Sequence, residues 1–192
     1  MTVVRWAYWS VCILGVLLSM SGCGGGDSTT NSENQSAVTI VPGVSIDHAD
    51  IGQTLAEITE HYGAPDTGTA QQGYVMVTWE NLGLSAGGID GNVNGVFDAD
   101  ELCQGLAVST PYPGKTSKGI GVGSTRVAVR NAYETPEEST ATNDKYLALG
   151  IAFIYQDDAS DAPVMQIAIF PAGSTVPTTS STLEGHPCRN NR

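Results

Sequence analysis

The chain has 192 residues, 8 Lys and Arg against 20 Asp and Glu, and a formal net charge of −12. This balance excludes a nucleic-acid-binding protein, because binding phosphate requires a concentrated basic face. With 41% hydrophobic and 15% charged residues, the composition fits one modest globular domain with irregular extensions and argues against a coiled coil or a fully disordered chain.

The N-terminus predicts export. Arg5 precedes a short apolar run from Val11 to Ser19, which ends in Met20-Ser-Gly-Cys23. The run is shorter than the roughly 20 apolar residues of a membrane-spanning helix. Its ending resembles the lipobox of bacterial lipoproteins, although Met20 stands where that family usually has an aliphatic residue. The resemblance implies a signal peptide over residues 1–22, a lipid on Cys23, and a place in the cell envelope, at the outer membrane or the cell surface. An ordinary secreted protein or a simple membrane anchor is the alternative.

Two polar segments flank the expected domain. Residues 23–38 are rich in Gly, Ser, Thr and Asn and predict a flexible tether, and residues 172–192 predict a disordered tail. After export, Cys103 and Cys188 remain as the two cysteines that carry no lipid. An oxidising envelope favours a disulfide between them, with two unpaired thiols as the alternative.

Two segments of the chain repeat each other. Residues 51–65 align without gaps on residues 122–136, and both have Gly-x-Thr at the start, apolar residues at helical spacing and a Pro at the end. In the first segment Thr54 and Glu57 fit a capping box, which predicts a helix that stops before Pro65. The second segment predicts the same helix with less marked ends.

Short β-like runs follow each expected helix. They lie at residues 74–79, 82–86 and 106–109 in the first copy, and at 146–149, 151–155 and 164–170 in the second. We therefore expect an α+β fold of two tandem α-β-β-(β) repeats, over residues 39–111 and 112–171. The helices are expected on one face of an antiparallel sheet.

The repeated motif is Gly-x-Thr-x-x-x-(Ile/Val) followed by Tyr-(Gly)-x-Pro. It resembles the small envelope lipoprotein domain of the SmpA/OmlA outer-membrane assembly type, and its tandem form resembles the β-lactamase-inhibitor-protein fold. The resemblance implies a non-catalytic module that binds another protein of the envelope. An inhibitor or accessory protein of a secreted enzyme is the alternative.

A twelve-residue segment, residues 90–101, has oxygen-bearing side chains at the spacing of an EF-hand-type calcium loop. Gly at its sixth position permits the sharp turn, and a final Glu can bind the cation with both oxygens. We expect one structural Ca²⁺ here, in an isolated loop because the preceding residues are Gly-rich and strand-like. An ordinary Asn/Gly/Asp-rich hairpin turn is the alternative. The expected ligands are Asp90, Asn92, Asn94, the Val96 carbonyl, Asp98 and Glu101.

One catalytic motif is weighed and set aside. Residues 83–87 have the G-x-S-x-G spacing of a nucleophile elbow around Ser85, with His186 as a possible base. That elbow requires a helix after the turn, and the Gly-rich sequence that follows cannot begin one. We therefore expect no enzymatic activity.

Overall fold

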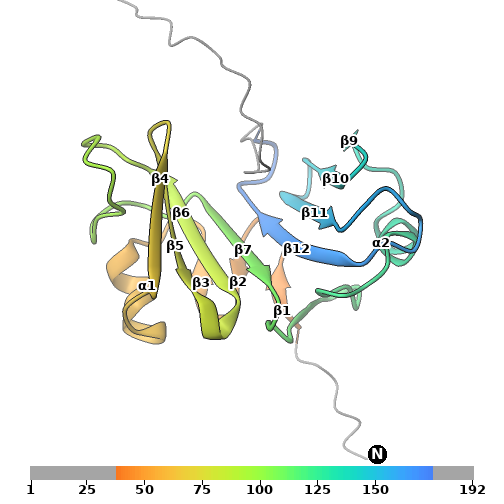
Figure 1. The fold of residues 1–192 in the computed structure, drawn as a ribbon, viewed down its shortest axis with the longest axis horizontal. Coiled ribbons are helices and arrows are strands. Elements are labelled where there is room, and N and C mark those ends of the chain that lie inside the picture. The colour runs from red at the N-terminus through yellow and green to blue at the C-terminus, as the bar shows by residue number, and fades with distance from the viewer. Residues whose placement is uncertain (1–37, 175–192) are drawn as a thin grey trace, which may run out of the picture. The chain divides into compact units, whose positions relative to one another are not determined.

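The computed structural model describes residues 38–174. The fold is α+β, as predicted, with two short α-helices, one eight-stranded sheet and one four-stranded sheet (Figure 1). The predicted signal peptide, Cys23, the tether up to residue 37 and the tail from residue 175 lie outside the described residues, so the predictions for them stay predictions.

The large sheet is antiparallel throughout, in the order β4-β5-β6-β7-β12-β11-β10-β9. Helix α1 precedes β4, helix α2 precedes β9, and β7 pairs with β12 where the two runs of strands meet. The bounds are α1 (Leu55–Tyr62), β4 (Thr67–Gln71), β5 (Tyr74–Trp79), β6 (Leu84–Ile89), β7 (Gly105–Ser109), α2 (Arg126–Tyr133), β9 (Glu138–Ser139), β10 (Asn143–Tyr146), β11 (Ile151–Tyr155) and β12 (Val164–Ile169).

The small sheet was not predicted. It has the order β3-β2-β1-β8, from β1 (Val38–Val41), β2 (Ser45–Ile46), β3 (Ala49–Asp50) and β8 (Lys115–Thr116). Because β1 runs parallel to β8, the segment before α1 is joined to the segment between the two runs of strands. Ile40, Ile46 and Ala49 are fully buried and belong to the same core as the large sheet.

One face of the large sheet forms the core. Residues directly opposite each other in an antiparallel pair have their side chains on the same face. The indole N–H of Trp79 donates to the carbonyl of Gly63 at the end of α1 (2.9 Å), and the ring of Tyr133 in α2 packs on Phe153 with centroids 5.2 Å apart. Trp79 and Phe153 are on the same face, so both helices contact it. The register that connects them runs through Trp79, Leu84, Val108, Ile167 and Phe153, all buried.

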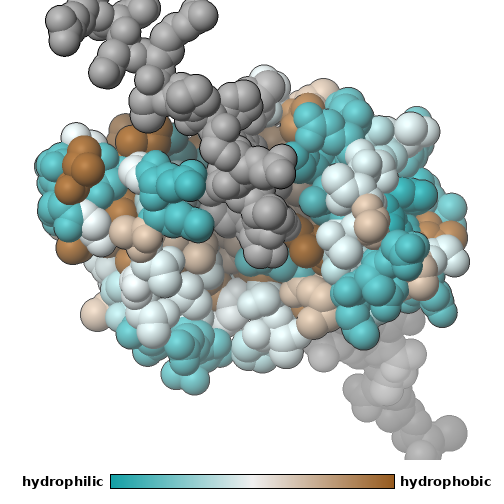
Figure 2. All heavy atoms as spheres, turned by 45° about the horizontal axis from the view of Figure 1, so that its top comes forward, coloured by the Kyte–Doolittle hydropathy of each residue, from teal (hydrophilic) through white to brown (hydrophobic). Residues whose placement is uncertain are grey.

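The opposite face, which we call the open face, has mainly small and polar side chains, with larger apolar ones such as Met76 and Ile154 among them. Within residues 38–174 its one charged pair lies near the β9 end, where Lys145 Nζ contacts Glu138 Oε2 at 2.9 Å. Where coloured surface is visible in Figure 2, apolar residues form separate patches among hydrophilic ones. Partly exposed residues of the open face include Met76, Thr78, Ser85, Ala107, Ser109, Ile154, Gln166 and Ala168.

Both helices begin at a threonine. The Thr54 hydroxyl accepts from the N–H of Glu57 (3.3 Å), and the Glu57 carboxylate accepts from the N–H of Thr54 (2.8 Å), so the predicted capping box is confirmed. In α2 the Thr125 hydroxyl accepts from the N–H of Ala128 (3.3 Å). An alanine cannot return the second bond, which is why the second helix is less marked in the sequence.

A loop closes the first turn of each helix. The first N–H groups of a helix have no partner within the helix, so they need one elsewhere. Here the β6–β7 loop serves α1 and the β11–β12 loop serves α2 through backbone carbonyls. The bonds are Leu55 N–H to Glu101 O (3.1 Å), Ala56 N–H to Ala99 O (2.9 Å), Arg126 N–H to Ala162 O (3.0 Å) and Val127 N–H to Ser160 O (2.8 Å).

Some predicted boundaries are wrong. Of the predicted strand at 146–149, only Tyr146 is in a strand, which lies earlier, at Asn143–Tyr146; a turn follows from residue 147 to Gly150, whose φ is 70°. The first strand of the small sheet includes Val38, the last residue of the predicted tether. Gly173, in the predicted tail, donates its N–H to Leu147 O at 2.8 Å.

Candidate functional site

The predicted calcium loop connects β6 to β7. It starts directly after Ile89, and its second half is fixed to the N-terminus of α1 by the carbonyls of Ala99 and Glu101. The side chain of Phe97 is buried and holds the middle of the loop against the core. The sheet therefore fixes the position of the start of the loop, and the helix fixes the position of its end. The polar residues of the loop lie between these two ends.

Asp90 organises the first half of the loop. Its side chain is buried, one oxygen accepts from the N–H of Asn94 (3.0 Å), and the other accepts from the N–H of Gly95 (2.7 Å). The chain reverses here through Val93 (φ 60°) and Gly95 (φ 80°). The predicted role of Gly95 in the sharp turn is thus confirmed in the backbone.

Asp98 accepts hydrogen bonds from both amide side chains of the loop. The Nδ2 groups of Asn92 (2.6 Å) and Asn94 (2.7 Å) both donate to Asp98 Oδ2. The Asn94 Oδ1 atom accepts from the N–H of Val96 (2.7 Å). Three of the predicted ligands, Asn92, Asn94 and Asp98, therefore lie in direct contact.

Glu101 closes the loop on itself. Its Oε1 accepts from the N–H of Gly91 (2.7 Å) and its Oε2 accepts from the N–H of Asp98 (3.0 Å). The Glu101 carboxylate thus joins the start of the loop to its end. Glu101 is also the residue that the sequence predicts as the ligand that binds with both oxygens.

The donor set fits calcium in kind but is arranged here as a hydrogen-bonded network. Among residues 38–174, no three His, Cys, Asp or Glu side chains form a cluster that could hold a metal ion. Three carboxylates and two amides are hard oxygen donors of the type that calcium prefers. Binding would require Asn92 and Asn94 to turn their amide oxygens, in place of their N–H groups, toward an ion that Asp98 also coordinates.

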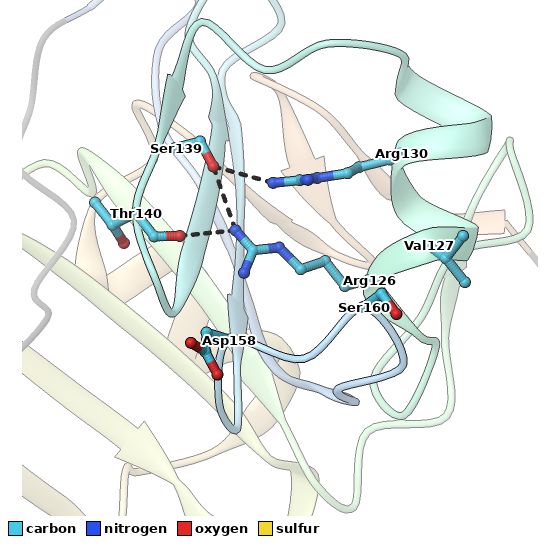
Figure 3. A pocket seen from close by; sticks show the side chains of 7 residues that line it. All are labelled: Arg126, Val127, Arg130, Ser139, Thr140, Asp158 and Ser160. Atoms are coloured by element: carbon cyan, nitrogen blue, oxygen red, sulfur yellow. Dashed lines mark hydrogen bonds between the residues drawn. The ribbon is translucent and has the colours of Figure 1, made fainter.

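A second polar site was missed by the sequence analysis. It is an ionic cluster of Arg126 and Arg130, one turn apart on α2, with Asp144 of β10 (Figure 3 shows the two arginines); Arg126 and Asp144 are buried and Arg130 is exposed. Arg126 Nη2 lies 2.8 Å from Asp144 Oδ1 and Arg130 Nε lies 2.9 Å from Asp144 Oδ2. The hydroxyls of Ser139 (2.7 Å) and Tyr155 (3.1 Å) also donate to this carboxylate.

The cluster keeps Asp144 ionised inside the protein. Burial alone raises the pKa of Asp144, but the hydrogen bonds from Arg130, Arg126 and Ser139 outweigh it and hold the pKa well below its usual range. Burial, and then the neighbouring charge of Asp144, raise the pKa of Tyr155 well above its usual range. The cluster ties α2 to β9, β10 and β11.

A hollow of about 440 Å³ lies beside these arginines (Figure 3). Asp158 in the lining and Asp144 between the arginines equal the two guanidinium groups in number, so the formal charges of these four side chains cancel. Its shape and charge do not define a ligand. The lining residues are Arg126, Val127, Arg130, Ser139, Thr140, Asp158 and Ser160.

The remaining candidate residues are placed as follows. Ser85 lies within β6, and its hydroxyl is 3.0 Å from that of Thr78. Cys103 is buried, its thiol donates to the Gly105 carbonyl (3.2 Å), and burial raises its pKa to about 11. His186 and Cys188 lie outside the described residues, so the predicted disulfide stays a prediction.

Comparison of the chain with protein-family models, with curated proteins and with solved structures finds no match in any of the three. Neither helix of the part between residues 38 and 174 is long and apolar enough to cross a bilayer. The part of the chain that the structure describes is thus an α+β fold with two polar sites and one open sheet face.

Proposed function

We propose that this chain is a lipid-anchored protein of a bacterial cell envelope, and that it acts as a non-catalytic module that binds a protein partner. The observation that carries the proposal is the open face. A sheet that is buried on one side and has mainly small and polar side chains on the other, with single apolar residues among them, provides a broad, rigid surface for a protein partner.

The two halves are, in this proposal, copies of one duplicated unit. Helices α1 and α2 have the same length and begin at equivalent residues of the aligned segments 51–65 and 122–136. Each is followed by four strands of the large sheet, and each has its first turn closed by the corresponding loop. Duplication accounts for the width of the open face.

A partner on this face can be tested by substitution. Ala107→Arg places a long cation at the centre of the open face, and Val127→Arg adds the same side chain to an exposed position on α2. Purification of the anchored protein from solubilised envelopes is expected to recover the same partner with the parent chain and with Val127→Arg, and to lose it with Ala107→Arg. Equal recovery by both variants, or no partner with the parent chain, would count against the open face.

The alternative is an inhibitor of a secreted enzyme, which would use the same face. The same purification separates the two, because an inhibitor is expected to recover one enzyme in stoichiometric yield and to abolish its activity. An envelope scaffold is expected to leave the activity of its partner intact.

We also propose that the loop of residues 90–101 binds one calcium ion that stiffens the β6–β7 connection. Asp90, Asn92, Asn94, Asp98 and Glu101 would supply side-chain oxygens, and Val96 its carbonyl. The support is the closure of the loop by Asp90 and Glu101 and the contact of both amides with Asp98. The ion would add rigidity and no catalytic chemistry.

Calorimetry tests the ion. Exported single loops bind calcium with dissociation constants on the order of 10⁻⁴ to 10⁻³ M, so titration at millimolar calcium is appropriate. Glu101→Gln is expected to abolish the heat of binding, whereas Asp100→Asn, which removes an exposed carboxylate outside the ligand set, is expected to retain it. No heat with the parent chain would end the proposal.

The lipid anchor has a separate test. Cys23→Ser is expected to release the protein from the membrane fraction and to remove the incorporation of labelled palmitate. Retention in the membrane fraction after this substitution would instead indicate an uncleaved anchor.

A further inference from the structure

Strand β4 forms one end of the large sheet (Figure 1). All five of its residues, Thr67–Gln71, are exposed, and its partner in the structure is β5 on one side. Within residues 38–174 no strand pairs with its other side. An edge of this kind presents backbone N–H and C=O groups that can pair with a further strand.

The ladder identifies which groups point outward. In an antiparallel pair, residues that exchange hydrogen bonds alternate with residues that do not. The bond from Asp90 N–H to Gly73 O (3.0 Å) continues the β5–β6 register and sets this alternation. Residues 74, 76 and 78 of β5 therefore bond to β4. Their partners there are Gln71, Thr69 and Thr67. The N–H and C=O groups of Gly68 and Ala70 are left facing away from the sheet.

The two ends of the sheet differ. Strand β9 has two residues, comes directly after Pro136 and Glu137, and has Glu138 in an ion pair with Lys145 (2.9 Å). Short strands, charges and prolines are the features that prevent pairing at an edge. Strand β4 has five residues, with no charge and no proline. Within residues 38–174 the large sheet therefore has one open edge and one protected edge.

We propose that β4 pairs with β4 of a second copy of this chain, antiparallel, about a two-fold axis through Thr69. Gly68 then exchanges hydrogen bonds with Ala70 of the second copy, and Ala70 with Gly68, so all the outward groups of the strand are satisfied. Thr69 faces its own counterpart, a favourable cross-strand pair.

Charge supports a second copy as the occupant. The chain has a net charge of −12, so most of its surface repels another copy, but the strand Thr67–Gln71 is uncharged. In this register Asp66, the acid nearest to the strand in sequence, is opposite Gln72 and not opposite another acid. Because the other edge is protected, the pairing closes at two copies and does not continue into a fibre.

Cysteine cross-linking in intact cells tests the register. At a non-hydrogen-bonded pair the Cα atoms are about 4.5 Å apart, which a disulfide can span. Thr69→Cys is therefore expected to give a covalent dimer under mild oxidation. Thr67→Cys is the matched control, because its counterpart is displaced by four residues, about 13 Å along the strand. Both are made with Cys188→Ser, which removes the native thiol of the tail.

A second variant tests the backbone pairing. Ala70→Pro, added to Thr69→Cys, removes one outward N–H without removing a bond to β5, and cross-linking is expected to fall to the level of Thr67→Cys. If Ala70→Pro unfolds by circular dichroism, Thr69→Lys provides the same test by light scattering, since two cations on the axis are expected to leave a monomer. Equal cross-linking at 67 and 69, no dimer at 69, or a dimer that survives these substitutions would overturn the proposal.

Discussion

The ring of Tyr74 lies across Gly87 on the open face, where a Cβ on Gly87 would be 2.7 Å from Tyr74 Cε1. The same phenol lies near Gly105, at 3.2 Å from a Cβ built there. The Tyr74 side chain thus covers the backbone at Gly87 of β6 and Gly105 of β7, where no side chain of the strand itself does so. Burial in this position raises the pKa of Tyr74 to about 12.

Gly87→Ala is expected to displace the Tyr74 ring. Forcing a methyl group into a packed contact costs about 1–3 kcal/mol of unfolding free energy. The pKa of Tyr74 is expected to fall toward its ordinary value of about 10, because the phenol becomes hydrated. Denaturant unfolding and ultraviolet titration of tyrosinate measure the two effects. Gly68→Ala is the control, since its Cβ would make only ordinary contact with Val77 (3.7 Å), and it is expected to change neither quantity.

Asp144→Asn is expected to destabilise the protein by about 3–5 kcal/mol, because Arg126 and Arg130 lose the one carboxylate between them. Glu138→Gln, in the more exposed pair with Lys145, is expected to cost less than about 1 kcal/mol. Urea unfolding at neutral pH compares them. Equal, small losses would show that the cluster contributes little.

The pH dependence of stability follows from the same carboxylate. The pKa of Asp144 is lower in the folded protein than in the unfolded chain, so its stabilisation is fully present above the unfolded value of about 3.9. It is lost as the pH falls below that value toward the folded pKa. Asp144→Asn is therefore expected to have a flatter decline in unfolding free energy below pH 4 than the parent chain. Parallel declines would contradict the assignment.

Val93→Gly is expected to stabilise the loop. Val93 has a φ of 60°, which is costly for a β-branched residue, and its side chain is 80% exposed, so little packing is lost. Relief of this strain is expected to add about 1 kcal/mol to the unfolding free energy and, if the loop binds calcium, to raise its affinity. Val96→Gly, at an exposed position where φ is not positive, is the control and is expected to give no gain.

Thr54→Ala and Thr125→Ala are each expected to cost about 1 kcal/mol, because each removes the side chain that caps a helix. The loss at Thr54 is expected to be the larger, since Glu57 also loses the hydroxyl that it contacts at 3.0 Å. Thr54→Ser retains the cap and is expected to be near neutral. Thermal unfolding of the three variants provides the comparison.

The helices and several strands were predictable because their signals are local. The capping box of Thr54 and Glu57 fixed the start of α1, and apolar runs identified β5 and β11 within their observed bounds. Strand β4 was not predicted because all its residues are exposed, so no alternation of apolar and polar residues marks it.

The ionic cluster was not predictable because its partners are distant in sequence. Asn143 and Asp144 are buried although they are polar, which concealed β10 and shifted the predicted strand toward the apolar residues after it. The i, i+4 spacing of Arg126 and Arg130 was the available signal, but it did not indicate which acid lies between them. The loop of residues 90–101, by contrast, is continuous, and its internal contacts follow the predicted spacing.

Photo-cross-linking in intact cells can decide whether the open face binds a protein. A photoreactive amino acid at Ser109, on this face, is compared with one at Val127, on the exposed surface of α2. One discrete protein adduct is expected at Ser109 and none at Val127. An adduct formed equally at both positions, or at Val127 alone, would contradict binding at the open face.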